Sequence, residues 1–541
     1  MKRIATGTWC PAWVPESTKL LASILLVCSM AQSATVGYDG SCLNGLNILP
    51  SYSNYFNLNA ATTGLNTASI FIGGIISNLV GGMITDRLGR RLTMLYFSLV
   101  ALIGILLQTA AQDVAMFTVA RIVLGFGTGV EGIAAGVYLN ETFPSRWRTW
   151  GVGTLNNFYY IGALIAAGVT LGTSSWPNST WAWRLPSLLQ GVFSIICIML
   201  VPFIPESPRW LVNRGLLDEA QDTVALTNSN GDKRAPVTVA VYNEIVETIA
   251  WEKDVGKKLS PLDLFKGKTN RRRLMIGASP GVITSSTGNI IASYYLGDEL
   301  ATAGVTSSTA QLQANVVLNV WCLICAVAGT QALVSWGRKP SAMLCQFSLI
   351  VMLYIIGGLS KMYADNTAAN ITSSNALVYG NVACVFLFQG FYSLCYTPIL
   401  NLYPPEIMNY SMRANGFAFM NLLLNCCALV LVYVMPIGIA NIGWKMYMIN
   451  ASWDWLFLIF IQAVFWVETK GMTLEEIDGI FEGEKHSSGP DVEAVRTGRA
   501  EVDKDEEKAE HEEHARPGEY YAGIQRLGET TRPTLSGEED E

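Results

Sequence analysis

The stretch Pro205-Glu206-Ser207-Pro208-Arg209-Trp210-Leu211 decides the fold, because it closes one long apolar segment and opens a polar one. A related stretch, Val467-Glu468-Thr469, follows another apolar segment, with Glu468 placed 262 residues after Glu206. A duplicated, very hydrophobic chain with charged residues at the end of each half is typical of a membrane transporter made of two helical bundles. This pattern does not favour an enzyme.

Long apolar segments make up most of the chain. Of its 541 residues, 50% are hydrophobic and only 15% are charged, and many segments reach the roughly 20 residues that cross a hydrocarbon core. The first is too long, and too soon followed by others, for a cleaved signal peptide. We predict twelve transmembrane helices, near residues 19–39, 63–85, 92–111, 115–139, 150–171, 184–204, 274–297, 312–335, 341–361, 378–400, 414–439 and 446–467.

The acidic C-terminal tail accounts for the net charge of −7. Residues 482–541 hold 18 of the 43 Asp and Glu residues but only 8 of the 36 Lys and Arg residues, so the tail carries −10 and the rest +3. An acidic segment with few aromatic residues does not bury enough apolar surface to fold. We therefore expect a disordered, solvated tail, with a regulatory role as the alternative.

Positive charges lie on one side of the twelve-helix arrangement, which predicts that both termini are cytosolic. The sequons that begin at Asn178 and Asn370 then fall outside, where N-glycosylation can occur. We expect an integral, multi-pass protein of the plasma membrane, with the lipid bilayer as its surroundings. The cations that set this orientation are Arg87, Arg90, Arg91, Arg146, Arg148, Arg271, Arg272, Arg273, Arg338, Lys339 and Arg413.

The two halves carry matching motifs. Asp86-Arg87-Leu88-Gly89-Arg90-Arg91 follows the second predicted helix, and Trp336-Gly337-Arg338-Lys339 follows the eighth. Glu141 after the fourth helix parallels Glu406 after the tenth, 265 residues later. Two similar halves that hold a substrate between them are a known transporter architecture. We divide the chain into an N-terminal segment 1–18, a six-helix bundle 19–204, a helical cytosolic linker 205–273, a second six-helix bundle 274–467 and a mostly disordered tail 468–541.

These motifs, together with Gly37-Tyr38-Asp39-Gly40, Trp183-Arg184 and Glu468-Thr469-Lys470-Gly471, resemble the sugar porter family of the major facilitator superfamily. The resemblance covers about residues 20–482, and Thr397-Pro398 with Leu402-Tyr403-Pro404 is similar to the fungal hexose and lactose permease branch. It implies an all-α membrane protein with the major facilitator fold, which works as a monomer. We expect no cofactor, metal or nucleic acid.

Charged residues at the cytosolic helix ends correspond to the inner gate of the family. Opposite charges there can pair across the two halves when the cytosolic side closes. A single exposed pair contributes about 0 to 1 kcal/mol, but a network whose pairing differs between conformations shifts their equilibrium. Simple membrane anchoring is the alternative. The predicted gating residues are Asp86, Arg87, Arg90, Arg91, Glu141, Arg148, Glu206, Arg209, Arg338, Glu406, Arg413 and Glu468.

Ionisable residues inside the predicted helices indicate proton coupling, since such groups are costly unless paired or hydrated. In proton-coupled members of the family that this chain resembles, an acid at the position of Asp39 titrates beside an arginine at that of Arg121. Capping of the outer helix end by Asp39 is the alternative. Glu131 is a second proton carrier, a solute contact or a carboxylate hydrogen-bonded within the bundle. We place Asp454 near the outer interface.

The predicted substrate site departs from the family pattern. Sugar sites use side-chain amides and aromatic rings, but the glutamine pair and asparagine of the family's seventh helix align with Thr284, Ser285 and Ile290. These departures remove the family's usual hexose ligands but leave the transport motifs in place. The sequence therefore favours a transporter more strongly than it favours a sugar as the solute. The candidate substrate-binding residues are Asn156, Asn157, Thr284, Ser285, Asn289, Asn319 and Asn401, with Asn315, Asn421 and Asn425 as further amides.

Other chemistry is not indicated. All three histidines lie in the tail, which excludes a histidine-based catalytic or metal site in the membrane body. The segment Gly125-Phe126-Gly127-Thr128-Gly129 lies inside a predicted helix, so close helix packing explains it better than a nucleotide-binding loop.

The sequence therefore predicts a secondary active transporter of the sugar porter type, driven by protons, for a small polar solute. Two alternatives stay open. One is a carrier of a polyol, organic acid or secondary metabolite, with export as one of its possible directions. The other is a nutrient receptor that does not transport.

Overall fold

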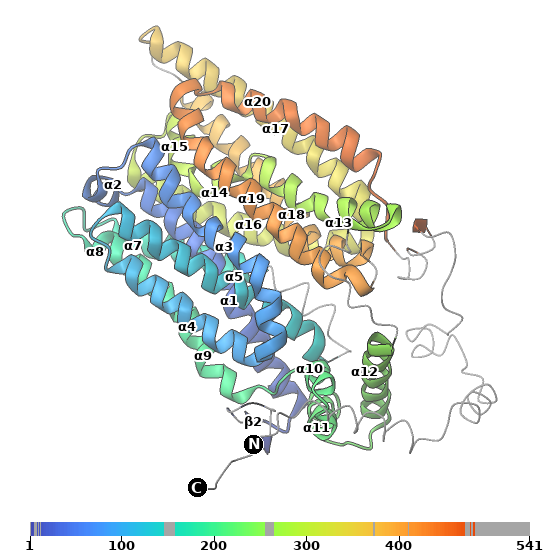
Figure 1. Cartoon of the computed structure of the whole chain (residues 1–541). Helices are drawn as coiled ribbons and strands as arrows, with labels where there is room; N and C mark the ends of the chain where they lie inside the picture. Colours follow the sequence, from blue (N-terminus) through green and yellow to red (C-terminus); the bar gives the residue numbers. More distant parts are fainter. Residues whose placement is uncertain are drawn as a thin grey trace, which may run out of the picture.

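The computed structural model describes residues 2–4, 8, 10, 12–144, 157–254, 265–371, 374–408, 410–470, 477 and 480–481. These residues are almost entirely helical. Figure 1 shows two neighbouring groups of helices, the N-terminal one in blue and cyan and the C-terminal one in yellow to orange.

The first group begins with a helix that is longer than predicted. Helix α1 continues for nine residues beyond Asp39, so this carboxylate lies inside the helix and the capping alternative is wrong. The elements of this half are α1 (Thr18–Ile48), α2 (Pro50–Phe56), α3 (Ala60–Leu88), α4 (Arg90–Thr109), α5 (Val114–Thr142), α7 (Asn157–Thr173), α8 (Trp181–Leu189), α9 (Gly191–Leu200) and the 3-10 turn η1 (Val201–Phe203).

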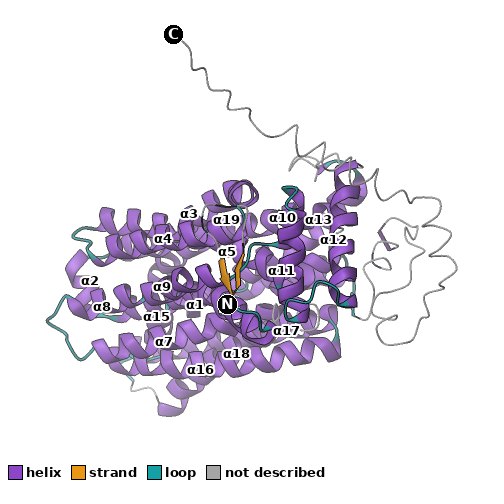
Figure 2. Ribbon diagram, turned by 90° about the horizontal axis from the view of Figure 1, so that it is seen from below, coloured by secondary structure: helices purple, strands orange, loops and turns teal. Residues whose placement is uncertain are grey.

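Three helices of the predicted linker follow: α10 (Pro208–Asn213), α11 (Leu217–Ser229) and α12 (Pro236–Asp254). The α10 helix starts where it does because the Ser207 hydroxyl caps it, accepting from the Trp210 N–H at 3.3 Å, with Pro208 in the first turn. An antiparallel hairpin, β1 (Lys2–Ile4) and β2 (Ala12–Val14), lies at the N-terminus, as Figure 2 shows. This hairpin is the one addition to the predicted all-α architecture in the described chain.

The second group contains a broken helix at the seventh predicted span. The break falls at Gly288, whose φ of 87° favours glycine. The elements of this half are α13 (Lys268–Ser286), α14 (Asn289–Tyr294), α15 (Leu296–Thr302), α16 (Ser308–Trp336), α17 (Arg338–Ala368), α18 (Asn375–Ile407), α19 (Tyr410–Ile442), α20 (Lys445–Leu456) and the π-helix η3 (Phe457–Ala463).

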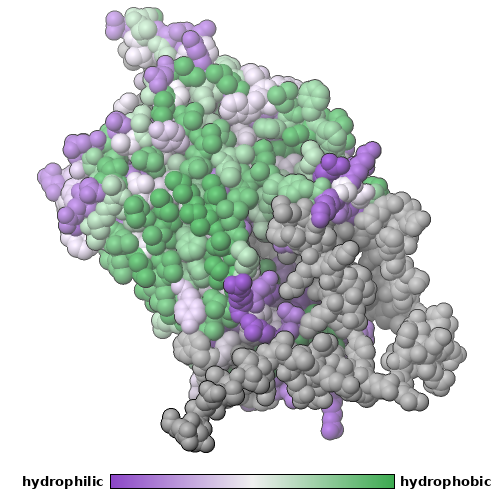
Figure 3. Space-filling view, in the orientation of Figure 1, coloured by the Kyte–Doolittle hydropathy of each residue, from purple (hydrophilic) through white to green (hydrophobic). Residues whose placement is uncertain are grey.

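Nine helices of the described chain are long and apolar enough to cross a membrane. The other three predicted spans are also helical, as α7, as α13 with α14, and as α20 with η3. The twelve-helix arrangement is consistent with these elements. Figure 3 shows apolar residues covering the side of the helical body, as a surface facing lipid requires.

Small residues allow the helices of the first half to approach closely. An added Cβ at Gly125 would lie 2.1 Å from the carbonyl oxygen of Ile70 on α3, and one at Gly127 would lie 2.7 Å from the backbone nitrogen of Ala101 on α4. Helix α5 therefore packs tightly between α3 and α4. The predicted packing role of this glycine run is confirmed.

The two halves contact each other along several helix pairs. Helix α3 packs against α19, α7 packs against α16, and α1 packs against α14, α15 and α16. The interface between the two halves is therefore formed by these helices.

Candidate functional site

A buried ion pair joins α1 and α5 inside the first half. Arg121 donates Nη1 to Oδ1 and Nη2 to Oδ2 of Asp39, each at 3.0 Å. Gln190, between α8 and α9, donates to the same Oδ1 at 3.0 Å. Asp39 is 3% exposed and Arg121 is 0% exposed. The structure thus brings the two sequence-predicted residues into bidentate contact, and it adds Gln190, which sequence reasoning missed.

Two further residues missed from sequence, Tyr159 and Tyr294, lie beside this pair. An added Cβ at Gly40 would lie 3.0 Å from the Tyr159 hydroxyl and 3.8 Å from that of Tyr294. Tyr159 belongs to α7 and Tyr294 to α14, so the surroundings of the ion pair reach into the second half. The sequence signal for the Tyr159 contact is the pair of glycines near Asp39, Gly37 and Gly40. Gly37 lets the Tyr159 backbone approach α1, and Gly40 leaves room for the Tyr159 hydroxyl.

Amides gather where α1 meets α14, α15 and α16. Asn44 donates to the Ala292 carbonyl and to Asn315 Oδ1, both at 3.4 Å, and it accepts from the Leu296 N–H at 3.1 Å. Asn319 donates to Asn315 Oδ1 at 3.1 Å and to Ser41 Oγ at 3.4 Å. Asn319 was predicted, whereas Asn44 was missed because the first span was predicted to end at residue 39.

In the seventh predicted span, the hydroxyl groups of Thr284 and Ser285 donate hydrogen bonds within their own helix. Thr284 Oγ1 donates to the Pro280 carbonyl at 2.8 Å, and Ser285 Oγ donates to the Gly281 carbonyl at 2.9 Å. Only their acceptor lone pairs remain for a solute. Asn289 is half-buried at the start of α14 and accepts from Ser293 at 3.2 Å.

The remaining predicted amides are only partly described. Asn157 is buried at the start of α7. Asn156 and the side chain of Asn401 lie outside the described residues.

Glu131 lies inside the first half. Its Oε1 accepts from Ser98 of α4 at 2.7 Å, Cys197 of α9 is a further neighbour, and no hydrogen-bond partner is recorded for Oε2 among the described residues. The side chain is 0% exposed. This position supports a carboxyl within the bundle rather than a solute contact.

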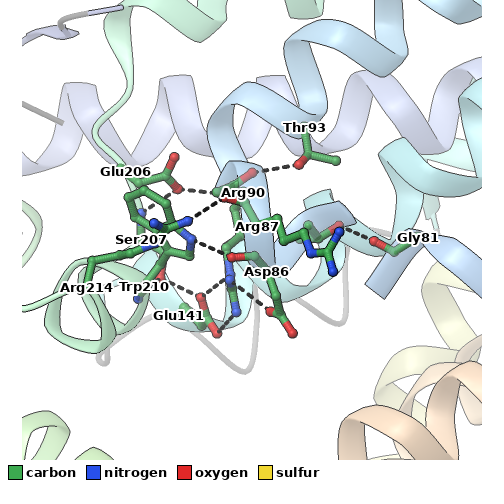
Figure 4. A network of polar contacts seen from close by, with 12 residues as sticks. Gly81, Asp86, Arg87, Arg90, Thr93, Glu141, Glu206, Ser207, Trp210 and Arg214 are labelled. Atoms are coloured by element: carbon green, nitrogen blue, oxygen red, sulfur yellow. Dashed lines mark hydrogen bonds and ion pairs between the residues drawn. The ribbon is translucent and has the colours of Figure 1, made fainter. Parts of the chain in front are cut away.

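A network of polar contacts ties together the ends of α3, α4, α5 and α10 that the sequence predicts to be cytosolic (Figure 4). Arg90 pairs with Glu141 at 3.0 Å and with Asp86 at 3.2 Å. Glu206 accepts from the backbone N–H groups of Arg90 at 2.9 Å, Arg91 at 3.2 Å and Ser207 at 2.9 Å. Burial raises the pKa of Glu206 to about 7, although these donors favour its ionised form.

The second half repeats this network almost residue for residue. Arg338 pairs with Glu406 at 2.8 Å. Glu468 accepts from the backbone N–H groups of Arg338 at 3.0 Å and Lys339 at 2.9 Å. Thr469 donates to Glu406 at 2.6 Å, just as Ser207 donates to Glu141 at 2.5 Å. The structure therefore shows the internal repeat at the level of single hydrogen bonds.

These ion pairs differ from the predicted pairing across the halves. Arg90 with Glu141, Arg90 with Asp86, and Arg338 with Glu406 each join helices of one half. The reason is that each glutamate lies in the last turn of a helix of its own bundle, beside the arginine. Arg87 is exposed and Arg209 half-buried, whereas Arg148 and the side chain of Arg413 lie outside the described residues.

Asn178 and Asn370 are both exposed, in the connections between α7 and α8 and between α17 and α18.

Comparison with known proteins adds a family and a fold. A family model described as "Sugar (and other) transporter" matches residues 24–481. The MFS-type transporter criB of Aspergillus cristatus is 28% identical over 468 residues, which cover 85% of this chain and 94% of that protein. The high-affinity glucose transporter of Kluyveromyces lactis is 28% identical over 457 residues, which cover 82% of each.

Two solved structures are similar along most of the chain. The inward-open xylose transporter XylE from E. coli has a TM-score of 0.67 at 20% identity, covering 85% of this chain and 99% of that one. The proton:xylose symporter XylE bound to 6-bromo-6-deoxy-D-glucose has a TM-score of 0.69 at 20% identity, covering 86% and 100%. The fold is therefore that of the major facilitator superfamily.

Proposed function

We propose, from the premise that this chain belongs to the sugar (and other) transporter family, that it moves a small, sugar-like polar solute across a membrane by alternating access. The observation that carries the proposal is the buried Asp39–Arg121 pair, which lies beside a cluster of amides at the interface of the halves. Amides offer both donors and acceptors to hydroxyl groups.

The geometry of this pair supports proton coupling. A proton on Asp39 removes the charge that holds Arg121, and an unpaired buried arginine costs on the order of 3 to 5 kcal/mol. Arg121 must then find new partners, and the tyrosines around it belong to both halves. Protonation of Asp39 therefore favours a rearrangement of the halves. Glu131 is proposed as a second carboxyl that titrates inside the first bundle.

The two cytosolic networks give each half rigidity. Arg90 with Glu141 and Arg338 with Glu406 hold neighbouring helix ends together within a half. The remaining predicted gating residues act, in this proposal, on the same helix ends. The halves then move as units, with the linker 205–273 between the bundles 19–204 and 274–467.

A non-sugar metabolite is the second candidate solute. Thr284 and Ser285 stand where the family pattern has a glutamine pair, and both donate to backbone carbonyls. A site with fewer free donors suits a solute that accepts fewer hydrogen bonds than a sugar does, such as a secondary metabolite with few hydroxyl groups.

The decisive experiment is uptake into proteoliposomes for a panel of sugars, polyols and organic acids, with and without a pH gradient. We expect accumulation of one class that needs the gradient. Asp39→Asn should reduce accumulation at least about tenfold while solute exchange continues. Asp113→Asn is the matched control, because Asp113 is an exposed cap of α5 and asparagine also caps helices. Gradient-driven accumulation in Asp39→Asn equal to that of the control contradicts proton coupling at this site.

Plasma-membrane location, cytosolic termini and a monomeric state belong to the proposal. Glycosylation at Asn178 and Asn370 is tested by the mass lost on glycosidase treatment, which Asn178→Gln with Asn370→Gln should abolish.

A further inference from the structure

The second half contains an acidic residue that the proposed mechanism does not use. Asp454 lies on α20 and is 0% exposed, so its carboxyl is enclosed by the protein. The indole N–H of the neighbouring Trp453 is a donor close to the Asp454 carboxyl, but it points to the Ser286 carbonyl at 2.8 Å. No hydrogen bond of good geometry reaches either carboxylate oxygen from the described residues.

Asn450 is one helical turn from Asp454, on the same face of α20. It is also 0% exposed, and neither its Oδ1 nor its Nδ2 has a recorded partner in the described chain. An added Cβ at Gly288 would lie 2.6 Å from Asn450 Nδ2. The two polar side chains therefore line the face of α20 that packs on the break between α13 and α14.

Further buried polar side chains lie near Asp454. The Tyr396 hydroxyl accepts from Gln462 Nε2 at 2.6 Å and donates to Gln346, and it lies within electrostatic reach of Asp454. Gln462 Oε1 and Gln346 Nε2 have no recorded partner among the described residues. Buried polar atoms without partners are rare and point to an ion or water.

Among the described residues, no cation is a recorded electrostatic neighbour of the Asp454 carboxyl, so none compensates a carboxylate anion there. Tyr396 on α18 lies within electrostatic reach of Asp454, whereas Tyr447, about two turns before Asp454 on α20, faces Glu299 on α15. Cys345 of α17 and Cys395 of α18 lie beside Tyr396. Lys361 of α17 and Lys445 of α20 stack on Trp444 at the start of α20, 5.3 and 6.0 Å from the ring.

We propose that Asp454 is a further proton-binding carboxyl of this transporter, in the second half, facing the break of the seventh span. A buried carboxylate without donors takes up a proton instead of remaining charged. Movement at Gly288 shifts the backbone beside Asn450, admits water to Asp454 and lets the proton leave. In the first half, Asp39 is paired with Arg121. In the second half, Asp454 is neutral instead. This inference rests on the proposed transport cycle, in which the seventh span moves.

The test is infrared spectroscopy of the purified full chain in lipid, as pH difference spectra in H2O and D2O. We expect Asp454→Asn to lose the intensity of one protonated-carboxyl C=O band that is present in the wild type. Asp365→Asn, an exposed aspartate of the same half, is the matched control and should keep that band. Gel filtration confirms that both variants are folded.

Three outcomes decide the matter. Loss of the band in Asp454→Asn alone supports the proposal. An unchanged band shows that Asp454 is ionised and overturns it. A band that disappears on adding Na+ at constant pH also overturns it, because the site then binds a metal cation. The measurement needs no transported solute, so failure to find one leaves it interpretable.

Discussion

At the scale of single residues, Glu206 sets the pH dependence of the first cytosolic network. It is 1% exposed, and burial raises its pKa from 4.5 to about 7. The folded chain then binds a proton more tightly than the unfolded chain. This contribution to stability is present below about pH 4.5 and is lost as the pH rises to about 7.

We therefore predict that the melting temperature in detergent falls between about pH 5 and about pH 7 in the wild type and falls less in Glu206→Gln. The shift corresponds to about 3 kcal/mol for a group this deeply buried. Glu16→Gln, at an exposed position, is the control and should follow the wild type. Parallel pH profiles of Glu206→Gln and the wild type contradict the prediction.

The residues that sequence reasoning found and missed differ in one physical respect. Asp39 and Arg121 are charges inside apolar segments, so their cost alone draws attention. Gln190 and Asn44 are neutral amides, and a neutral amide in a helix is easily satisfied by a neighbour. Only the structure shows that Gln190 donates to Asp39 and that Asn44 bonds to the second half.

At the scale of elements, close packing of α5 explains why its glycines lie where they do. A methyl group at Gly125 would lie 2.1 Å from the Ile70 carbonyl oxygen, whereas one at Gly136, on the same helix, would meet nothing within 4 Å. Alanine raises helix propensity equally at both positions, by up to about 1 kcal/mol. Any difference between the two variants therefore reports packing.

We predict that Gly125→Ala lowers stability by about 1 to 3 kcal/mol, because α3 and α5 must separate. Gly136→Ala should be neutral or slightly stabilising. Melting temperature and the yield of monodisperse protein measure both effects. Equal stability of the two variants shows that α3 can shift without cost.

Element ends and breaks were less predictable than element positions. Hydropathy locates an apolar segment but does not report where hydrogen bonding stops. Helix α1 therefore extends to Ile48 through polar residues that bond to the other half. The break at Gly288 is likewise invisible to composition, because one glycine in an apolar run has many uses.

At the scale of the whole molecule, the two halves are held together where α1 ends, on the side that we propose to be the outer one. Asn44 and Asn47 of α1 bond to the Ala292 and Tyr294 carbonyls of α14. An added Cβ at Gly297 would lie 2.7 Å from Ile48 Cγ1. Alternating access requires these contacts to separate when the outer side opens.

We predict that a disulfide between Ile48→Cys and Gly297→Cys stops net transport, since it fixes α1 to α15. Oxidation should lower uptake at least about tenfold, and a reductant should restore it. The control pair is Ile105→Cys with Gly191→Cys, where an added Cβ at Gly191 would lie 3.8 Å from Ile105 Cγ2 within the first half. A bridge inside one half does not oppose movement between halves.

The wild type must be oxidised in parallel, because Cys28 and Cys197 already place their sulfur atoms 3.7 Å apart. Peptide mass spectrometry establishes which bridge has formed. If a fully formed bridge between residues 48 and 297 leaves transport unchanged, α1 and α15 stay together throughout the cycle. The opening must then occur elsewhere, and the rigid movement of two halves is the wrong description of this protein.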